Sequence, residues 1–284
     1  MADTAFQKQY RAEMIAAFEV GQSLLRDSVT TESVIKGNSA EFLVAGSGGA
    51  TAVTRGVNGL IPARADDLAQ VSTPLTEWHD LVRVTGFNVF ASQGDRRSLM
   101  QRTTMNVINR KVDNEIITQL NTGSVNTGAA AVGSLALVLK SQTILQNSGV
   151  PWDGQVWGLI TPAMNAYLLQ VASYSSADYV DTKPMAGSNQ AAWSDKVKAR
   201  RWLDINWIVH PSLPGAGTNA EKCFLFHKSA IGHAVNKDGM MSPVGYDEEQ
   251  DYSYARCSVY MGSKVLQNSG IVVMNHDGSA YVAA

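Results

Sequence analysis

A glycine-rich loop and a group of cysteine and histidine residues have the side-chain types that nucleotide or metal chemistry requires. The loop at 46–59 lacks the Gly-Lys-Ser/Thr ending of a phosphate-binding loop, and no strand followed by a helix brackets it, so we interpret it as a flexible tip. Cys223, His227 and His233 have a spacing that could suit zinc. A closed zinc site needs four ligands, however, and only the distant Cys257 could complete it, so structural roles are favoured.

Two clusters of charged residues are further candidates. The acidic cluster consists of Asp247, Glu248, Glu249 and Asp251. Carboxylates this close repel one another, which favours a counter-ion, an Arg or Lys partner or solvent exposure over a metal. The basic cluster consists of Lys196, Lys198, Arg200 and Arg201, with Trp193 and Trp202 as its aromatic neighbours. This composition favours a surface or an interface over recognition of nucleic-acid bases.

The sequence predicts no active site. No Gly-x-Ser-x-Gly motif of a hydrolase is present. Any chain of this length holds enough Ser, His and Asp to imagine a catalytic triad, so their presence is not specific. We therefore expect a protein that is not an enzyme and that uses no cofactor and no metal.

The composition is that of a globular, weakly charged chain. Its 284 residues include 23 Lys+Arg against 25 Asp+Glu, a formal net charge of -2. Charged residues make up 17% and hydrophobic residues 45%, which excludes an intrinsically disordered protein, and the near-neutral balance argues against a dedicated nucleic-acid binder. No apolar run predicts a membrane span, no secretory signal is recognised, and two cysteines exclude a disulfide framework. Such a chain could hide much of its surface in contacts with its own copies.

The N-terminal third predicts two parts that need a partner surface. Residues 6–25 form an amphipathic helical arm, because apolar side chains recur there at four-residue spacing. These side chains are Phe6, Tyr10, Met14 and Phe18. Residues 31–91 predict a long two-stranded finger, with strand candidates at 41–44, 81–84 and 87–90. Its tip carries Gly46, Gly48, Gly49, Arg55, Gly56 and Gly59. An isolated hairpin is only marginally stable in water, so the finger should lie on something else.

The middle of the chain predicts one long helix at 95–120, about 40 Å long. Asp95 is the expected N-cap and Gly123 the expected stop. Its buried stripe consists of Met105, Ile108, Val112, Ile116 and Leu120. A Gly/Ala/Asn-rich stretch at 121–133 predicts a boundary, and an alternating α/β pattern follows. That pattern has helices at 134–146 and from Thr161 onward, and strands at 156–160, 205–209, 223–226, 259–261 and 271–274.

This order of elements resembles the major capsid proteins of tailed bacteriophages, whose shell fold is shared with encapsulin nanocompartments. The shared order is arm, glycine-tipped β-finger, long helix, Gly/Ala-rich break, α/β domain and closing strands. Residues 158–164, followed by Leu168 and Leu169, resemble the strand-to-helix step of the family's A-domain. Residues 239–246 and 251–262 resemble its closing strands.

The resemblance implies an α+β fold, the tailed-phage major capsid fold, in five parts. These are an N-terminal arm at 1–30, an E-loop β-hairpin at 31–91, the spine helix and linker of a P-domain at 92–133, an α/β A-domain at 134–233, and closing P-domain strands at 234–284. It further implies that the chain assembles as pentamers and hexamers into an icosahedral shell around packaged double-stranded DNA. The arm and the E-loop tip would then contact neighbouring copies. The shell would be assembled in the host cytoplasm and become the virion capsid.

The resemblance also suggests partners and leaves alternatives open. A separate scaffolding protein and a portal are expected, a cementing protein is a further candidate, and no membrane is involved. Some family members cross-link a loop Lys to a neighbour's Asn. Here the tip offers Arg55, and Lys36 is the only lysine between Thr31 and Ala91, so we expect no such isopeptide. An encapsulin-like shell with an enzyme cargo, or an α/β enzyme, remains the alternative.

Overall fold

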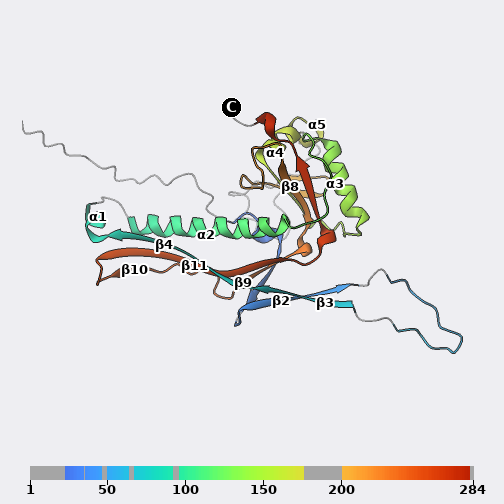
Figure 1. The fold of residues 1–284 in the computed structure, drawn as a ribbon, viewed down its shortest axis with the longest axis horizontal. Helices are drawn as coiled ribbons and strands as arrows, with labels where there is room; N and C mark the ends of the chain where they lie inside the picture. The colour runs from blue at the N-terminus through green and yellow to red at the C-terminus, as the bar shows by residue number, and fades with distance from the viewer. Residues whose placement is uncertain are drawn as a thin grey trace, which may run out of the picture.

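The computed structural model describes residues 23–34, 36–46, 50–63, 67–91, 96–175 and 200–281. Three parts are visible in Figure 1: a long helix lying along a sheet, an α/β domain at one end of that helix, and a hairpin that projects away from both. Within the described ranges, none of the helices has the length and apolar character needed to cross a membrane.

The long helix α2 (Arg96–Leu120) confirms the helix predicted at 95–120. It lies along one face of a five-stranded sheet of order β1-β9-β11-β10, with β4 paired to the other side of β11 (Figure 1). The strands are β1 (Thr30–Val34), β4 (Thr76–Thr85), β9 (Ile231–Asn236), β10 (Val244–Asp247) and β11 (Tyr252–Val265). Only β1 and β9 run parallel in this sheet. We call this sheet and helix the P-domain.

The predicted stripe of α2 is buried along most of its length. Ile108, Val112, Ile116 and Leu120 belong to the main core cluster. The prediction was wrong for Met105, which is 38% exposed. Toward the start of the helix the buried row continues through Thr104 and Met100 in four-residue steps. Met105 lies about 100° around the helix from Thr104, which turns its side chain out of this row.

The α/β domain, here called the A-domain, is built on a second sheet of order β12-β8-β5-β7-β6. Its strands are β5 (Val156–Ile160), β6 (Arg200–Trp202), β7 (Ile205–Val209), β8 (Glu221–His227) and β12 (Ile271–His276). Its helices are α3 (Leu135–Asn147), α4 (Pro162–Leu169) and α5 (Ala172–Ser175). Alternate residues of the central strands enter different cores: Leu159 faces the core shared with α2, whereas Ile160 faces the core that α3 and α4 complete.

Both predicted helix starts in the A-domain are confirmed. The Ser134 hydroxyl accepts a hydrogen bond from the Leu137 N–H at 3.3 Å, and Thr161 accepts one from Met164 N–H at 3.1 Å. Pro162 follows Thr161 in the first helical turn, where its missing N–H costs nothing. These caps satisfy amide groups that have no partner inside the helix.

The projecting hairpin consists of β2 (Ser39–Gly46) and β3 (Asp67–Pro74). The finger predicted at 31–91 is therefore too long. Its proposed return strand at 81–84 belongs to β4 in the P-domain sheet, where it pairs with β11. The segment at 87–90, predicted as a strand, lies in helix α1 (Gly86–Ala91), whose start is fixed by Gly86 N–H donating to Asp251 O at 3.1 Å.

Two further boundaries need correction. The last strand, β12, pairs with β8, so it belongs to the A-domain sheet and not to the closing P-domain strands predicted at 234–284. Strand β9 pairs with β1 and β11, so the first residues after Ala230 already belong to the P-domain. The chain therefore crosses from one domain to the other more often than a linear division allows. The predicted strand at 259–261 is the middle of the much longer β11.

Candidate assembly surfaces

Large apolar side chains of the hairpin are exposed to solvent. Leu43 is 72% exposed and Leu68 is 56% exposed. Because Leu68 pairs with Ala45, and Leu43 with Gln70, both leucines lie on the same face of the two-stranded ribbon. Beyond the ladder, the exposed apolar side chains are Val53, Val57, Leu60 and Ile61. Among the described residues, nothing covers these apolar side chains of the hairpin.

The tip of the hairpin is a closed turn. Gly56 N–H donates to Leu60 O at 2.9 Å, and Gly59 N–H donates to Gly56 O at 2.8 Å. Gly59 has φ +72°, a left-handed conformation that glycine adopts without strain. The turn includes Val57, whose side chain is fully exposed. Arg55 also belongs to this turn, and its guanidinium lies 3.5 Å from Gly59 O.

The remaining predicted tip and arm residues are only partly visible. Gly46 is the last residue of β2. Gly48 and Gly49 lie outside the described residues, and so does the predicted N-cap Asp95. The whole predicted arm stripe also lies outside them: Phe6, Tyr10, Met14 and Phe18.

The base of the hairpin is fixed by a contact that sequence reasoning missed. Phe42 is buried and its ring lies against Gly232 in β9, where an added Cβ would stand 2.8 Å from a ring carbon. Ala40 and Ala234 complete this small core. A lone glycine inside a strand often marks such a close approach, and that is the signal that could have identified it.

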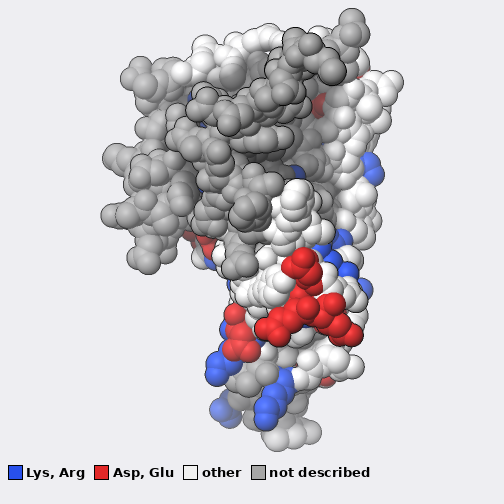
Figure 2. All heavy atoms as spheres, turned by 90° about the vertical axis from the view of Figure 1, so that its left-hand side faces the viewer, with Lys and Arg blue, Asp and Glu red and all other residues white. Residues whose placement is uncertain are grey.

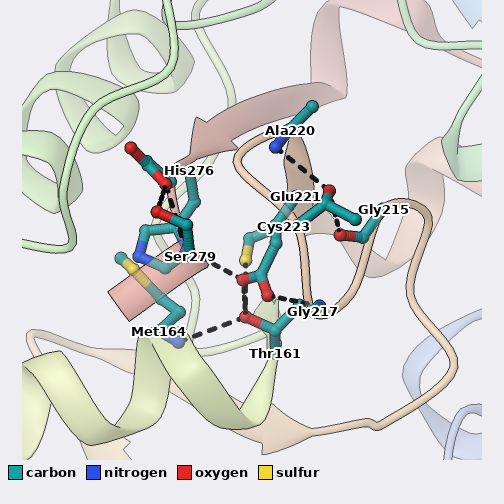
Figure 3. A network of polar contacts seen from close by, with 11 residues as sticks. Thr161, Met164, Gly215, Gly217, Ala220, Glu221, Cys223, His276 and Ser279 are labelled. Carbon is teal, nitrogen blue, oxygen red and sulfur yellow. Dashed lines mark hydrogen bonds and ion pairs between the residues drawn. The ribbon is translucent and has the colours of Figure 1, made fainter. Parts of the chain in front are cut away.

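A buried polar network holds the A-domain together (Figure 3). The Glu221 carboxylate accepts hydrogen bonds from Thr161 Oγ1 at 2.5 Å and from Gly217 N–H at 2.8 Å, and His276 Nδ1 lies 2.8 Å from it. The three side chains come from the start of α4, the start of β8 and the end of β12. The network therefore joins three elements that are far apart in sequence.

The structure does not bring the zinc candidates together. Cys223 lies beside Thr161, and burial raises the pKa of its thiol to about 12, which keeps it protonated. His227 Nε2 lies 3.1 Å from Asp153, and His233 Nδ1 lies 2.8 Å from Ser263 Oγ. In the described part of the chain, no three His, Cys, Asp or Glu residues group closely enough to hold a metal ion.

The acidic cluster closes the turn between β10 and β11. This end of the P-domain faces the viewer in Figure 2, where acidic side chains gather. Asp247 accepts hydrogen bonds from the N–H groups of Glu249 and Gln250 at 3.0 and 3.1 Å. The bond from Gln250, followed by one from the Tyr252 hydroxyl, lowers the pKa of Asp247. The Tyr246 hydroxyl donates to Asp251. The carboxylates of Asp247 and Asp251 are thus engaged with their own turn.

The two arginines of the basic cluster contact different partners. Arg200 donates to Tyr174 O at 3.2 Å and its guanidinium lies 4.7 Å from the centre of the Tyr174 ring. Arg201 pairs with Asp204 at 3.3 Å. Lys196 and Lys198 lie outside the described residues. The two described arginines therefore make contacts within the A-domain.

Comparisons with known proteins agree with this fold. A solved chain from Mycobacterium phage Che8 is 17% identical, with 96% of this chain and 98% of that chain covered and a TM-score of 0.70. The capsid of cyanophage P-SCSP1u is 15% identical, with 96% and 93% covered and a TM-score of 0.68. A virus-like particle from Pyrococcus furiosus is 13% identical, with 89% and 92% covered and a TM-score of 0.56. No curated protein matches the sequence.

At these identities the structural likeness shows the fold, and the predicted α+β capsid fold is confirmed. The family to which the chain belongs is shown by its sequence. A family model described as phage capsid protein matches residues 2–277, which is nearly the whole chain. The chain therefore belongs to the phage capsid protein family.

Proposed function

We propose that this major capsid protein assembles head to tail into rings of five and six copies, and that these rings close an icosahedral shell around double-stranded DNA. The observation that carries the proposal is the hairpin, which points away from its own body with its apolar side chains uncovered (Figure 1). The proposal places the hairpin of each copy on the P-domain of a neighbour. The N-terminal residues 1–22 would make a second contact with neighbours.

The energetics of the hairpin support this arrangement. A two-stranded ribbon without a packed face is only marginally stable in water. The large exposed apolar side chains of the hairpin are Leu43, Val53, Val57, Leu60, Ile61 and Leu68. Burying each contributes about 1.5–3 kcal/mol, so full coverage yields on the order of 10 kcal/mol before the costs of association. Every copy in a shell would make this contact once as donor and once as acceptor.

The geometry supports rings. The hairpin tip and the acidic β10–β11 turn lie at opposite ends of the described molecule (Figure 1). The tip therefore cannot reach the far end of its own P-domain. A contact between two different surfaces of identical chains is heterologous, and it closes into a ring when the rotation between copies divides a full turn. Small adjustments at the hairpin would allow both five- and six-membered rings.

The proposal also includes the contents of the shell and its partner proteins. The DNA would be enclosed without sequence specificity, as the net charge of -2 provides no strong phosphate-binding surface. A scaffolding protein, a portal and a cementing protein are the proposed partners, and the host cytoplasm is the proposed place of assembly. The family match to phage capsids does not favour the compartment with an enzyme cargo.

A shortened hairpin tests the proposal. Gly46 pairs with Asp67, so residues 47–66 can be replaced by Asn-Gly, which closes a two-residue hairpin at this point of the ladder. We expect a folded subunit with an unchanged far-ultraviolet circular dichroism spectrum and no shells in negative-stain micrographs. The unmodified chain under the same conditions should form shells. Shells of normal size from the shortened chain would refute the proposed role of the hairpin.

A further inference from the structure

Asp113 in the middle of α2 receives hydrogen bonds from a segment about ninety positions earlier in the chain. The Ser23 hydroxyl donates to Oδ1 at 2.5 Å, Leu25 N–H donates to Oδ1 at 3.2 Å, and Leu24 N–H donates to Oδ2 at 3.1 Å. The Asp113 side chain is almost fully buried. The carboxylate therefore holds residues 23–25, which directly follow the N-terminal residues 1–22. We call residues 23–29 the root of the N-terminal segment.

Apolar and local polar contacts complete this root. Leu25 and Val29 are each 1% exposed and belong to the same core cluster as Ile108 and Val112. Between them, Ser28 donates through both its N–H and its hydroxyl to Leu25 O. These apolar contacts and hydrogen bonds thus fix the backbone path of residues 23–29 before β1 begins.

The A-domain contacts the same carboxylate. His210, which follows β7, places Nε2 3.6 Å from Asp113 Oδ2, and its side chain is 5% exposed. Its Nδ1 accepts a hydrogen bond from Ser212 N–H at 3.2 Å. In a neutral ring the proton must then reside on Nε2, which faces the carboxylate. Oδ1 therefore accepts hydrogen bonds from Ser23 and Leu25, whereas Oδ2 accepts one from Leu24 and faces the His210 ring on its other side.

This donor arrangement requires a carboxylate. An asparagine has one oxygen and one NH₂ group of nearly the same shape. At position 113 either orientation of the amide would turn a donor toward an N–H or O–H donor of the root, and a buried donor without an acceptor is costly. A Gln at Glu115 provides the matched comparison, since Glu115 lies two residues further on the same helix and pairs only with Lys111 among the salt bridges of the described residues.

We infer that Asp113 is a positioning residue for assembly. It joins residues 23–25, the long helix and the A-domain at one point, and so fixes the position and direction of the chain where residues 1–22 connect to it. The inference rests on the proposed function in one respect, namely that the N-terminal segment contacts neighbouring copies. A loosened root would let that segment leave in many directions, and shell closure would suffer although the subunit stays folded.

Amide hydrogen exchange of the isolated full-length subunit tests the junction directly. In Asp113→Asn, the amide of Leu24 or that of Leu25 should exchange at least about tenfold faster, because the two amides donate to different oxygens and asparagine keeps only one of them. Amides in the middle of α2 should keep their protection, and Glu115→Gln should change neither. Unchanged exchange at Leu24 and Leu25 in Asp113→Asn would overturn the inference.

An assembly assay with the same variants tests the consequence. Asp113→Asn should yield at least about tenfold fewer closed shells than the unmodified chain, with open or irregular particles in their place, whereas Glu115→Gln should assemble normally. Uniform closed shells from Asp113→Asn with a loosened root would overturn the inference. If the unmodified chain forms no shells, the proposed function fails, and the exchange measurement alone decides the junction.

A second variant changes the donor of the hydrogen bond between Ser23 and Asp113. Ser23→Ala removes the hydroxyl donor without altering the helix, so it keeps the test valid even if Asp113→Asn does not fold. We expect Leu24 and Leu25 to exchange about threefold faster, with a smaller loss of closed shells. At Leu24 and Leu25 the double variant should show no further loss beyond Asp113→Asn, because the Ser23 hydroxyl reaches these amides through Asp113; the Arg26 N–H, which donates to Ser23 Oγ at 3.3 Å, is read separately. Additive losses, or wild-type behaviour of Ser23→Ala, would contradict the inference.

Discussion

Substituting Gly232 by alanine should displace the base of the hairpin. The added Cβ would stand 2.8 Å from Cζ and 2.9 Å from both Cε atoms of Phe42. Carbon atoms in proteins pack at about 3.5–4.0 Å, so the ring must move by most of an ångström. Both residues are confined, because Gly232 lies in a strand paired on both sides and Phe42 is buried. Neither neighbour can give way without breaking other contacts.

Overpacking of this kind costs about 1–3 kcal/mol. For a chain of this size each kcal/mol lowers the midpoint of thermal unfolding by about 2–4 °C. Gly232→Ala should therefore melt several degrees below the unmodified subunit. Gly56→Ala is the matched control, since its added carbon would meet only Leu60 O at 3.7 Å, and its melting temperature should not change.

A second substitution separates the proposed clash from a general effect of alanine in the strand. Phe42→Leu removes the ring, so in that background Gly232→Ala should cost at least about 1 kcal/mol less than it does alone. Thermal or urea unfolding of the four variants gives the coupling free energy between the two positions. Equal costs of Gly232→Ala in both backgrounds would refute the close approach as the cause.

Three further predictions follow from the contacts described. Burial holds the pKa of His233 at about 4, below its ordinary 6.5, so the unfolded chain takes up a proton more readily than the folded one. The free energy of unfolding should therefore be highest above pH 6.5 and fall by about 3 kcal/mol as the pH drops to 4. Urea unfolding across this pH range measures the loss, which should be absent from His233→Gln. Glu221→Gln should lower the free energy of unfolding by about 3–5 kcal/mol, because it leaves His276 and Gly217 without the carboxylate; calorimetry showing a change below 1 kcal/mol would contradict this. Mature particles should release single chains on denaturing electrophoresis, since residues 46–59 contain no lysine and Lys36 is the only lysine between Thr31 and Ala91; a ladder of covalent oligomers would overturn this prediction.

Local sequence signals predicted the elements that they determine locally. The four-residue spacing from Ile108 to Leu120 indicated α2, and Thr161 with Pro162 indicated the start of α4, because helix geometry and capping depend on near neighbours in sequence. The family's order of elements then supplied the architecture. What the sequence could not show was which strands pair. The residues at 81–84 and 271–274 read as strands in either sheet, and only the three-dimensional structure assigns them.

Two long-range contacts were missed for the same reason. Phe42 and Gly232 are far apart in sequence, and so are Asp113 and Ser23. Phe42 reads as an ordinary strand residue and Asp113 as part of the polar face of a helix. Neither the residue type nor its spacing in the sequence shows that such a side chain contacts a distant segment and does not face solvent. Long-range partners give such residues their role, and periodicity carries no information about them.

The most direct test of the account is a structure of the assembled particles determined by electron cryomicroscopy. We predict that residues 39–74 of each copy lie on the P-domain of an adjacent copy, with Leu43, Leu68 and Val57 buried between the two chains. Particles in which this hairpin contacts only its own chain, with those three side chains still exposed, would contradict the account.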